Sequence, residues 1–197
     1  MIKISSSCVI ETPRLILRAP QIGDGLIINE SINKSIMHLK KWMIWAQQPQ
    51  TLEESENYVK MCINNWASFK NDLPLFIFLK TSNTHIGGTG FHSLNWDIPS
   101  FETGYWLHVE HQNQGYMTEA LNAVIRYAFI QFKANRLEIL CDVNNLRSYT
   151  LAERLGFKLE GILKNHRINP STKQLSDTKV YARTNVLELP SLDVNWD

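Results

Sequence analysis

The apolar positions along the chain follow two periods, one typical of strands and one typical of helices. Alternation or short apolar runs predict strands over residues 12–18, 75–80, 85–94, 101–109, 136–142, 157–163 and 179–183. Helical spacing predicts helices within residues 24–45 and over residues 51–69, 120–132 and 146–155. This order of elements is typical of a mixed α+β protein, with helices on both faces of one sheet.

Local signals refine several of these elements. Irregular apolar spacing predicts a break between two helices within residues 24–45. Thr51 and Glu54 have the spacing of a capping box, which predicts a helix start there. Gly156 suits the left-handed position that ends the last helix, and Pro13 suits the first position of a strand.

The three strands over residues 75–109 are expected to form an antiparallel meander. Short polar connections separate them, with Ser82 and Asn83 in the first. Gly87, Gly88 and Gly90 lie inside the second strand, where glycine indicates a bulge or a close approach of another backbone. The sequence therefore predicts tight packing around this strand.

Length and charge exclude several classes of protein. The 197 residues predict one domain over residues 1–197, with a core from about residue 11 to residue 184 and short tails. Twenty basic and nineteen acidic side chains leave a net charge of +1. This near-balance gives no electrostatic reason to expect nucleic acid or an anionic membrane as a partner.

Signals for membrane insertion, export and metal binding are missing from the sequence. The longest apolar stretch, residues 73–79, contains Pro74 and is far shorter than the ~20 residues that a membrane-spanning helix needs. Residues 1–9 lack the apolar region of a signal peptide. Cys8, Cys62 and Cys141 are odd in number and widely spaced, which argues against disulfides and a zinc site. We therefore expect a cytoplasmic protein without a metal.

A polar turn between the third meander strand and the helix that contains residues 120–132 is a candidate anion site. The first backbone N–H groups of a helix have no partner within the helix and point outward. A diphosphate can bind such groups without a lysine or a metal. Every turn from strand to helix offers some free amides, so this signal alone also fits a plain connector.

The sequence around this turn resembles the acetyl-CoA signature Q/R-x-x-G-x-G/A of the GNAT superfamily of N-acetyltransferases. The residues that carry the resemblance are Gln112-Asn113-Gln114-Gly115-Tyr116-Met117. Three further segments also resemble the family: residues 11–18, its first strand; residues 115–120, its cofactor helix; and residues 145–157, its last helix. Together they are similar to the RimJ and RimL branch of ribosomal-protein N-terminal acetyltransferases, over residues 11–183.

The resemblance implies the GNAT fold and a set of cofactor contacts. The fold has a central, mostly antiparallel, twisted sheet with a splay between two central strands, which admits the pantetheine arm of acetyl-CoA. The implied cofactor residues are Leu107, His108, Val109, Gln112, Gln114, Gly115, Tyr116, Met117, Thr118 and Asn145. Amides of residues 114–118 would hold the diphosphate, and strand backbone at 107–109 would pair with the pantetheine. Met117 departs from the usual Gly or Ala, and we expect its side chain to point elsewhere.

Acetyl transfer from a thioester to an amine requires a proton for the departing thiolate. Family members often supply it from a Tyr in the last helix, where this chain has Ala152. Ser148 lies four residues earlier on the same helical face and matches the serine proposed as general acid in the RimL branch. The alternative is that Ser148 helps to cap the helix near Asn145, itself a candidate N-cap. Tyr149 is offset by about 100° and is a poorer candidate.

The resemblance also suggests a base. Glu102, on the strand before the turn, is the best candidate because several family members use a carboxylate on that strand; the alternative is a solvated or ion-paired residue. RimL also uses a Glu soon after its last helix, and Arg167 stands at that position here. Cys141 alternates with core positions, so we expect packing rather than a covalent acetyl-cysteine.

We expect an N-acetyltransferase that transfers the acetyl group by direct attack, with a protein N-terminal α-amine as the favoured acceptor. Trp42, Trp45 and His92 are candidate acceptor contacts, with core packing as the alternative for at least one Trp; Trp106 is expected in the core. The rival acceptors are a polyamine, an aminoglycoside or another small amine, and the rival function is a non-catalytic acyl-CoA sensor. The sequence leaves a homodimer open.

Overall fold

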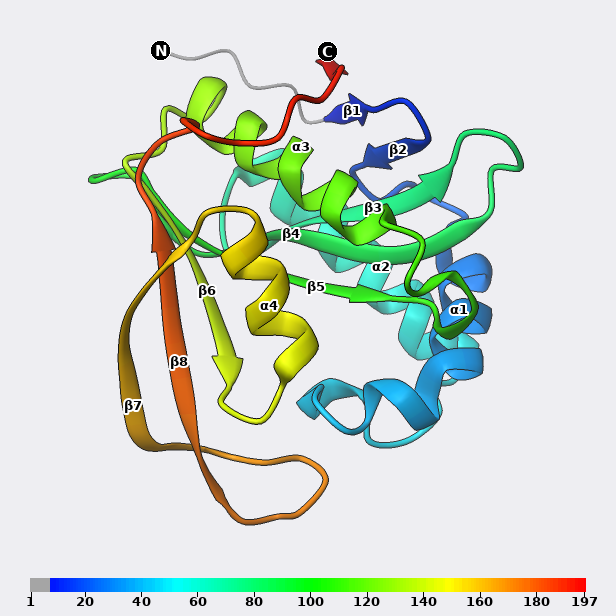
Figure 1. The fold of residues 1–197 in the computed structure, drawn as a ribbon. Helices are drawn as coiled ribbons and strands as arrows, with labels where there is room; N and C mark the ends of the chain where they lie inside the picture. The colour runs from blue at the N-terminus through cyan, green and yellow to red at the C-terminus, as the bar shows by residue number, and fades with distance from the viewer. Residues whose placement is uncertain (1–7) are drawn as a thin grey trace.

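One nine-stranded sheet runs through the computed structural model, which describes residues 8–197 (Figure 1). The strand order is β7-β8-β6-β5-β4-β3-β2-β1-β9. The strands are β1 Val9–Glu11, β2 Leu15–Arg18, β3 Leu73–Leu79, β4 His85–Asn95, β5 Ser100–Leu107, β6 Arg136–Asp142, β7 Lys158–Ile168, β8 Leu175–Arg183 and β9 Asn195–Trp196. All neighbours pair antiparallel except β5 and β6, which are parallel. The predicted mixed α+β architecture is confirmed.

Helices cover both faces of this sheet, with α3 and α4 on one face and α1 and α2 on the other (Figure 1). The helices are α1 Gly25–Leu39, α2 Leu52–Ser68, α3 Tyr116–Ile130 and α4 Leu146–Arg154, with 3-10 turns at Ile44–Ala46 and Val109–His111. The break predicted within residues 24–45 is therefore present. The capping box at Thr51 is also confirmed, because the Glu54 N–H donates to the Thr51 hydroxyl at 3.2 Å and the Thr51 N–H donates to the Glu54 carboxylate at 2.7 Å.

Strand β3 is buried on both faces, which explains why its sequence is a continuous apolar run rather than an alternating one. Leu75 and Ile77 belong to the large core that also contains the buried face of α3. Phe76 and Phe78 pack on the opposite side with Ile28 of α1 and with Val59 of α2.

The central strands β5 and β6 part after a short parallel ladder. Their pairing covers only Ser100–Glu102 against Arg136–Glu138. Beyond it, β5 continues to Leu107 paired only with β4, and β6 continues to Asp142 paired only with β8. The splay that the family resemblance implies is present, and it opens beside the N-terminus of α4 (Figure 1).

Several strand predictions need correction, and two short strands were not predicted. Pro13 lies in the turn between β1 and β2 instead of opening a strand, because the Thr12 hydroxyl accepts from the Leu15 N–H at 3.0 Å and closes that turn. The strand predicted through residue 109 ends at Leu107. The closing strands β7 and β8 are longer than predicted. The sequence did not reveal the full length of β7 because this strand is exposed on both sides and shows no alternation of apolar and polar residues. The short strands β1 and β9 carry too few residues for a periodic signal.

Candidate active site

Two cavities meet where β5 and β6 part. One, of about 610 Å³, extends over the N-terminus of α3 and is called here the cofactor pocket. The other, of about 800 Å³, lies between the sheet and the α1–α2 segment and is called here the acceptor pocket. Both are lined by Trp42, Met43, Tyr105, Trp106, Asn145 and Ser148. Groups bound in the two pockets can therefore meet at these six residues.

The cofactor pocket exposes the first turn of α3. Gly115, the N-cap, has left-handed dihedrals of φ +80° and ψ −1°, which glycine adopts without strain. No side chain caps the helix within the part of the chain that the structure describes. The expected residues that line the pocket are Leu107, Gln112, Gly115, Tyr116, Met117, Thr118 and Asn145. The Met117 side chain is buried in the core, as expected, so its unusual identity leaves the turn open.

Three of the expected cofactor contacts lie elsewhere. Gln114 does not line the pocket, and its side-chain amide donates to the Glu110 carbonyl at 3.2 Å. His108 and Val109 do not line it either, because the chain leaves the sheet after Leu107. The His108 N–H donates to the Ile86 carbonyl at 2.8 Å and the Val109 N–H to the Ser35 hydroxyl at 3.2 Å. The expectation of strand-like pairing with pantetheine at His108 and Val109 is thus not supported.

Basic side chains that the sequence analysis missed surround the cofactor pocket. Arg147 and Arg154 project into it from α4, and His38 does so from α1. Arg147 also donates to the side-chain oxygen of Gln112, so this contact joins α4 to the turn before α3. The pKa of His38 is lowered by burial and by the nearby Arg147 and Lys41. The lowered pKa favours the neutral form of His38, so the positive charge comes from Arg147 and Arg154, which suit a ligand with several phosphates.

Ser148 lies at the junction of the two pockets. The Asn145 side chain accepts from the Ser148 N–H at 3.3 Å, so Asn145, and not the Ser148 hydroxyl, is the N-cap of α4. The Ser148 hydroxyl lies 3.1 Å from the hydroxyl of Tyr105, which also donates to the Ser148 carbonyl at 3.0 Å. Burial raises the pKa of Tyr105 above its ordinary value, so this phenol stays protonated. The site thus holds two neighbouring hydroxyl groups that can carry a proton.

Tyr105 is the phenol that the sequence analysis missed. Ala152, which stands where the family often has a Tyr, is fully buried. Tyr149 lines neither pocket, and its ring packs under Lys179, whose Nζ lies 3.4 Å from the ring centroid. Tyr105 lies on β5 three residues after Glu102, and both line the acceptor pocket, but no motif in the sequence marks Tyr105 as part of the site.

Cys141 lines the acceptor pocket but is only 4% exposed. Burial raises the pKa of its thiol, and the neighbouring Ser148, Arg167 and Lys179 only partly oppose this effect. The thiolate needed for nucleophilic attack is therefore disfavoured. This environment agrees with the expected packing role.

The acceptor pocket is rich in carboxylates. Its acidic lining residues are Glu54, Asp72, Glu102 and Asp142, whereas Arg167 is its one Arg or Lys among the described residues. Glu102 lies opposite His92 in the β4–β5 ladder, and the Ser93 hydroxyl donates to its carboxylate at 3.4 Å. His92 Nδ1 lies 3.2 Å from the Asp72 carboxylate. The pocket thus has a negative lining that suits a cationic amine.

Burial raises the pKa of Glu102, while His92, Ser93 and Arg167 oppose the shift and Glu138 adds to it. A carboxylate with a raised pKa is a better proton acceptor than a free one. The structure thus places the candidate base in the acceptor pocket, on the same face of the sheet as His92.

The tryptophans form walls of the two pockets. Trp42 lines both, and Trp45 lines the acceptor pocket with 47% of its surface exposed. Trp106, which was expected in the core, is half-buried and lines both pockets, with its ring edge-on to Trp45 at 6.2 Å between centroids. Trp106 packs against the core cluster of Ile32, Leu39 and Ala46, as expected, while the parting of β5 and β6 leaves part of its ring open to the pockets.

The family model for the acetyltransferase (GNAT) domain matches residues 14–158, well over half of the chain. The chain belongs to the GNAT family of acetyltransferases. This assignment agrees with the parted strands and with the open N-terminus of α3 described above. The chain is therefore an N-acetyltransferase of this family, as the sequence resemblance implied.

Relatives of known name refine the position within this family. The chain is 30% identical to the ribosomal-protein-serine acetyltransferase of Escherichia coli strain K12, over 71% of this chain and 79% of that protein. It is 29% identical to the putative ribosomal N-acetyltransferase YdaF of Bacillus subtilis strain 168, over 74% of this chain and 78% of that protein. These similarities place the GNAT chain in the RimJ and RimL-like branch.

Solved structures of family members superpose closely. A RimL ribosomal-protein acetyltransferase in complex with coenzyme A has a TM-score of 0.84 and 25% identity, and the match covers 91% of this chain and 99% of that one. The microcin C7 self-immunity acetyltransferase MccE, in complex with acetyl-CoA and AMP, has a TM-score of 0.81 and 25% identity, over 88% and 93% of the two chains.

Over residues 8–197, no helix is both long and apolar enough to cross a bilayer. Within the same residues, no group of three or more His, Cys, Asp or Glu side chains is placed to hold a metal ion.

Proposed function

We propose that this acetyltransferase uses acetyl-CoA and transfers the acetyl group directly to a primary amine, with a protein N-terminal α-amine as the favoured acceptor. The observation that carries the proposal is the meeting of two chemically different pockets at Ser148. One offers open amides and arginines, and the other offers carboxylates.

The cofactor pocket suits coenzyme A in its charge and in its open backbone amides. The open amides of Gly115, Tyr116 and Thr118 suit a diphosphate at the start of α3. Arg147 and Arg154 add positive charge to the pocket, which suits the several phosphates of this cofactor. When bound there, acetyl-CoA supplies the activated acetyl group, and the gap between β5 and β6 directs its thioester end toward Ser148.

Residues of both pockets then handle the protons. The Glu102 carboxylate accepts the proton that the acceptor ammonium must lose, directly or through a water molecule. The amine nitrogen forms the new bond to the acetyl carbon, and the bond from that carbon to sulfur breaks. The nitrogen then loses its second proton to the hydroxyl pair of Tyr105 and Ser148, which replaces the proton that this pair gives to sulfur. The Ser148 hydroxyl gives its proton to the departing sulfur, and Tyr105 lies at 3.1 Å to restore it.

The proposed acceptor rests on the charge of the acceptor pocket and on the similarity to named relatives. The carboxylates of the acceptor pocket attract a cation, whether it is a peptide N-terminus or a polyamine. An α-amine, with a pKa of about 7.7 to 8.0, is already partly neutral at physiological pH and needs only a modest base. The relatives that are named as ribosomal-protein acetyltransferases favour the peptide N-terminus.

The test is to measure release of free coenzyme A thiol from acetyl-CoA with a panel of acceptors. The panel contains N-terminal peptides that begin with Ser or Ala, their N-blocked counterparts, polyamines and aminoglycosides. We expect the free peptides to give the highest kcat/KM and the blocked peptides to give none. Faster turnover of a polyamine or an aminoglycoside would assign a small-amine acceptor, and no turnover with any amine would overturn the proposal.

Replacement of Glu102 by Gln is expected to lower kcat about 10- to 100-fold, up to the lower end of the range for general acid–base catalysis, because an α-amine needs only a modest base. In the wild type, kcat should rise with pH as Glu102 loses its proton, at a pH above the ordinary glutamate pKa because burial raises the pKa of this carboxyl. This low-pH limb should vanish in Glu102→Gln. The measurement is kcat against pH between 4.5 and 9.

Two controls accompany this pH profile. Burial penalises the ionised form of Glu102 in the folded state, so its replacement by Gln should not lower the melting temperature at neutral pH. Glu138→Gln removes a carboxylate that raises the pKa of Glu102 and lies outside both pockets. This replacement should move the low-pH rise of kcat to lower pH, with little change in the maximum kcat. A limb that persists in Glu102→Gln would assign the base elsewhere.

A further inference from the structure

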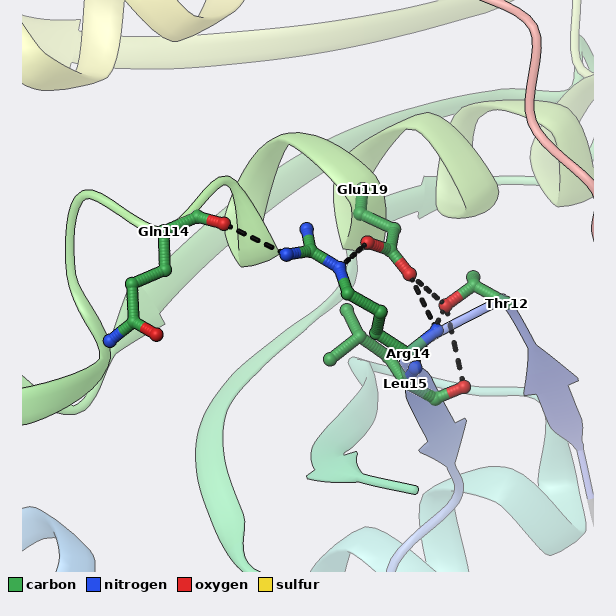
Figure 2. A network of polar contacts seen from close by, with 5 residues as sticks. All are labelled: Thr12, Arg14, Leu15, Gln114 and Glu119. Atoms are coloured by element: carbon green, nitrogen blue, oxygen red, sulfur yellow. Dashed lines mark hydrogen bonds and ion pairs between the residues drawn. The ribbon is translucent and has the colours of Figure 1, made fainter. Parts of the chain in front are cut away.

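A network of polar contacts joins the start of β2 to the first turn of α3 (Figure 2). The Glu119 carboxylate, on α3, receives the Arg14 Nε–H at 2.6 Å. Its other oxygen receives the Thr12 hydroxyl at 2.6 Å and the Arg14 backbone N–H at 3.0 Å. The Glu119 side chain is only 9% exposed, so the ion pair lies partly shielded from water. This network holds the two segments together.

The Arg14 guanidinium makes two further contacts with the turn before α3. Its Nη1 donates to the Gln114 carbonyl at 3.0 Å (Figure 2). Its central carbon lies 4.5 Å from the centroid of the Tyr116 ring, within cation–π distance. One side chain therefore contacts Gln114, Tyr116 and Glu119. These three residues span the turn that precedes α3 and the first turn of the helix.

The bond to the Gln114 carbonyl fixes the direction of the next amide. In a trans peptide group, the carbonyl of Gln114 and the N–H of Gly115 belong to one plane and point in opposite directions. Since the carbonyl points to Arg14, the N–H of Gly115 points to the opposite side of the turn. Gly115 lines the cofactor pocket, whereas Gln114 does not. The left-handed dihedrals of Gly115 accompany this orientation.

We propose that Arg14 is a positioning residue for cofactor binding, which holds the Gln114–Gly115 peptide so that the Gly115 N–H faces the diphosphate. Arg14 itself does not line the cofactor pocket, and its charge is paired with Glu119. It therefore acts through the backbone and not by touching the phosphates. This inference rests on the proposed use of acetyl-CoA and concerns only the diphosphate part of that substrate.

The test compares two acetyl donors, acetyl-CoA and S-acetylpantetheine, which carries the same thioester without the diphosphate. In Arg14→Gln, we expect kcat/KM to fall about 10-fold with acetyl-CoA and to stay within twofold with S-acetylpantetheine. The Kd of coenzyme A, measured by calorimetry, should rise by the same 10-fold. In Arg14→Lys, which keeps the charge but lacks the fork of donors, we expect an intermediate loss, since one ammonium cannot reproduce all these contacts.

Arg136→Gln is the matched control. Arg136 is likewise a partly exposed arginine that pairs with carboxylates, Glu138 and Glu160, but it lies on β6 outside both pockets. Its replacement should leave coenzyme A affinity unchanged. If Arg14→Gln does not fold, Arg14→Lys still tests the inference, through the ratio of kcat/KM with acetyl-CoA to kcat/KM with S-acetylpantetheine.

Two results would overturn the inference. An equal loss with both donors would mean that Arg14 acts only through general stability. An unchanged Kd of coenzyme A in Arg14→Gln and Arg14→Lys would mean that the Gly115 amide needs no such support. Failure of the proposed function can be distinguished from failure of this inference. If the wild-type protein binds coenzyme A but acetylates no amine, the Kd of coenzyme A can still be compared between the wild type and the Arg14 variants. A wild-type protein that does not bind coenzyme A would overturn both.

Discussion

Replacement of Ser148 by Ala is expected to lower kcat for acetyl transfer about 100-fold or more, the range found when a general acid is lost. Without the hydroxyl, Tyr105 is the one hydroxyl-bearing residue left among the described residues that line both pockets, and in the wild type it donates to the Ser148 carbonyl. The Kd of coenzyme A should change less than about threefold, because Ser148 does not belong to the turn that exposes the diphosphate amides. Steady-state kinetics and calorimetry measure the two quantities.

Two further variants separate proton donation from damage to α4. Tyr149→Phe removes a hydroxyl one residue away that faces neither pocket, and it should keep the wild-type kcat. Tyr105→Phe should lower kcat by a smaller factor than Ser148→Ala, since it removes the partner of Ser148 and leaves the donor in place. If Ser148→Ala keeps wild-type turnover, or if Tyr105→Phe alone abolishes it, Ser148 is not the acid.

Replacement of Gly90 by Ala is expected to destabilise the protein by roughly 3–5 kcal/mol. A Cβ at this position would lie 2.5 Å from the Leu73 carbonyl oxygen and 2.7 Å from Cα of Pro74, both backbone atoms of β3. Those atoms cannot move away without disturbing the β3–β4 ladder, in which Gly90 pairs with Pro74. The φ of +149° adds strain for any residue with a side chain. The melting temperature should fall by about 10 °C.

Gly161→Ala provides the control for this prediction. Gly161 lies on β7, and a Cβ there would meet no atom within 4 Å. Its φ is not among the positive values, so alanine fits its backbone. We expect an unchanged or slightly raised melting temperature, because alanine restricts the unfolded chain. Similar melting temperatures for Gly90→Ala and the wild type would contradict the prediction, because they would mean that β3 and β4 can move apart to admit the Cβ at little cost.

Local sequence signals were sufficient for the elements whose physics is local. The capping box at Thr51 needs only two residues three apart, and the left-handed stop at Gly156 needs only one. The open turn at Gly115 and the serine at 148 were recognised because their motif is contiguous. Strand β7 shows the limit, since a strand exposed on both sides has no hydrophobic period to detect.

The parts of the site that depend on distant segments were not predictable in this way. Tyr105 and Ser148 meet across 43 positions of sequence, and Arg14 and Glu119 across 105. No period or motif connects such pairs, because their distance is set by the packing of α4 and α3 on the sheet. The carboxylates that line the acceptor pocket come from α2, β5, β6 and the segment before β3, so their shared lining appears only after folding.

The amino-acid sequence by itself determined the family, the order of the elements and the turn at Gly115 that exposes backbone amides. Each of these rests on neighbouring residues, whose hydrogen bonds and hydrophobic spacing act over a few positions. Only the tertiary structure decided where β5 and β6 part, which hydroxyl lies beside Ser148 and which arginine orients the Gln114 carbonyl. The physical reason is that a strand or helix fixes the direction of a side chain, whereas its partner is chosen by how complete elements pack together.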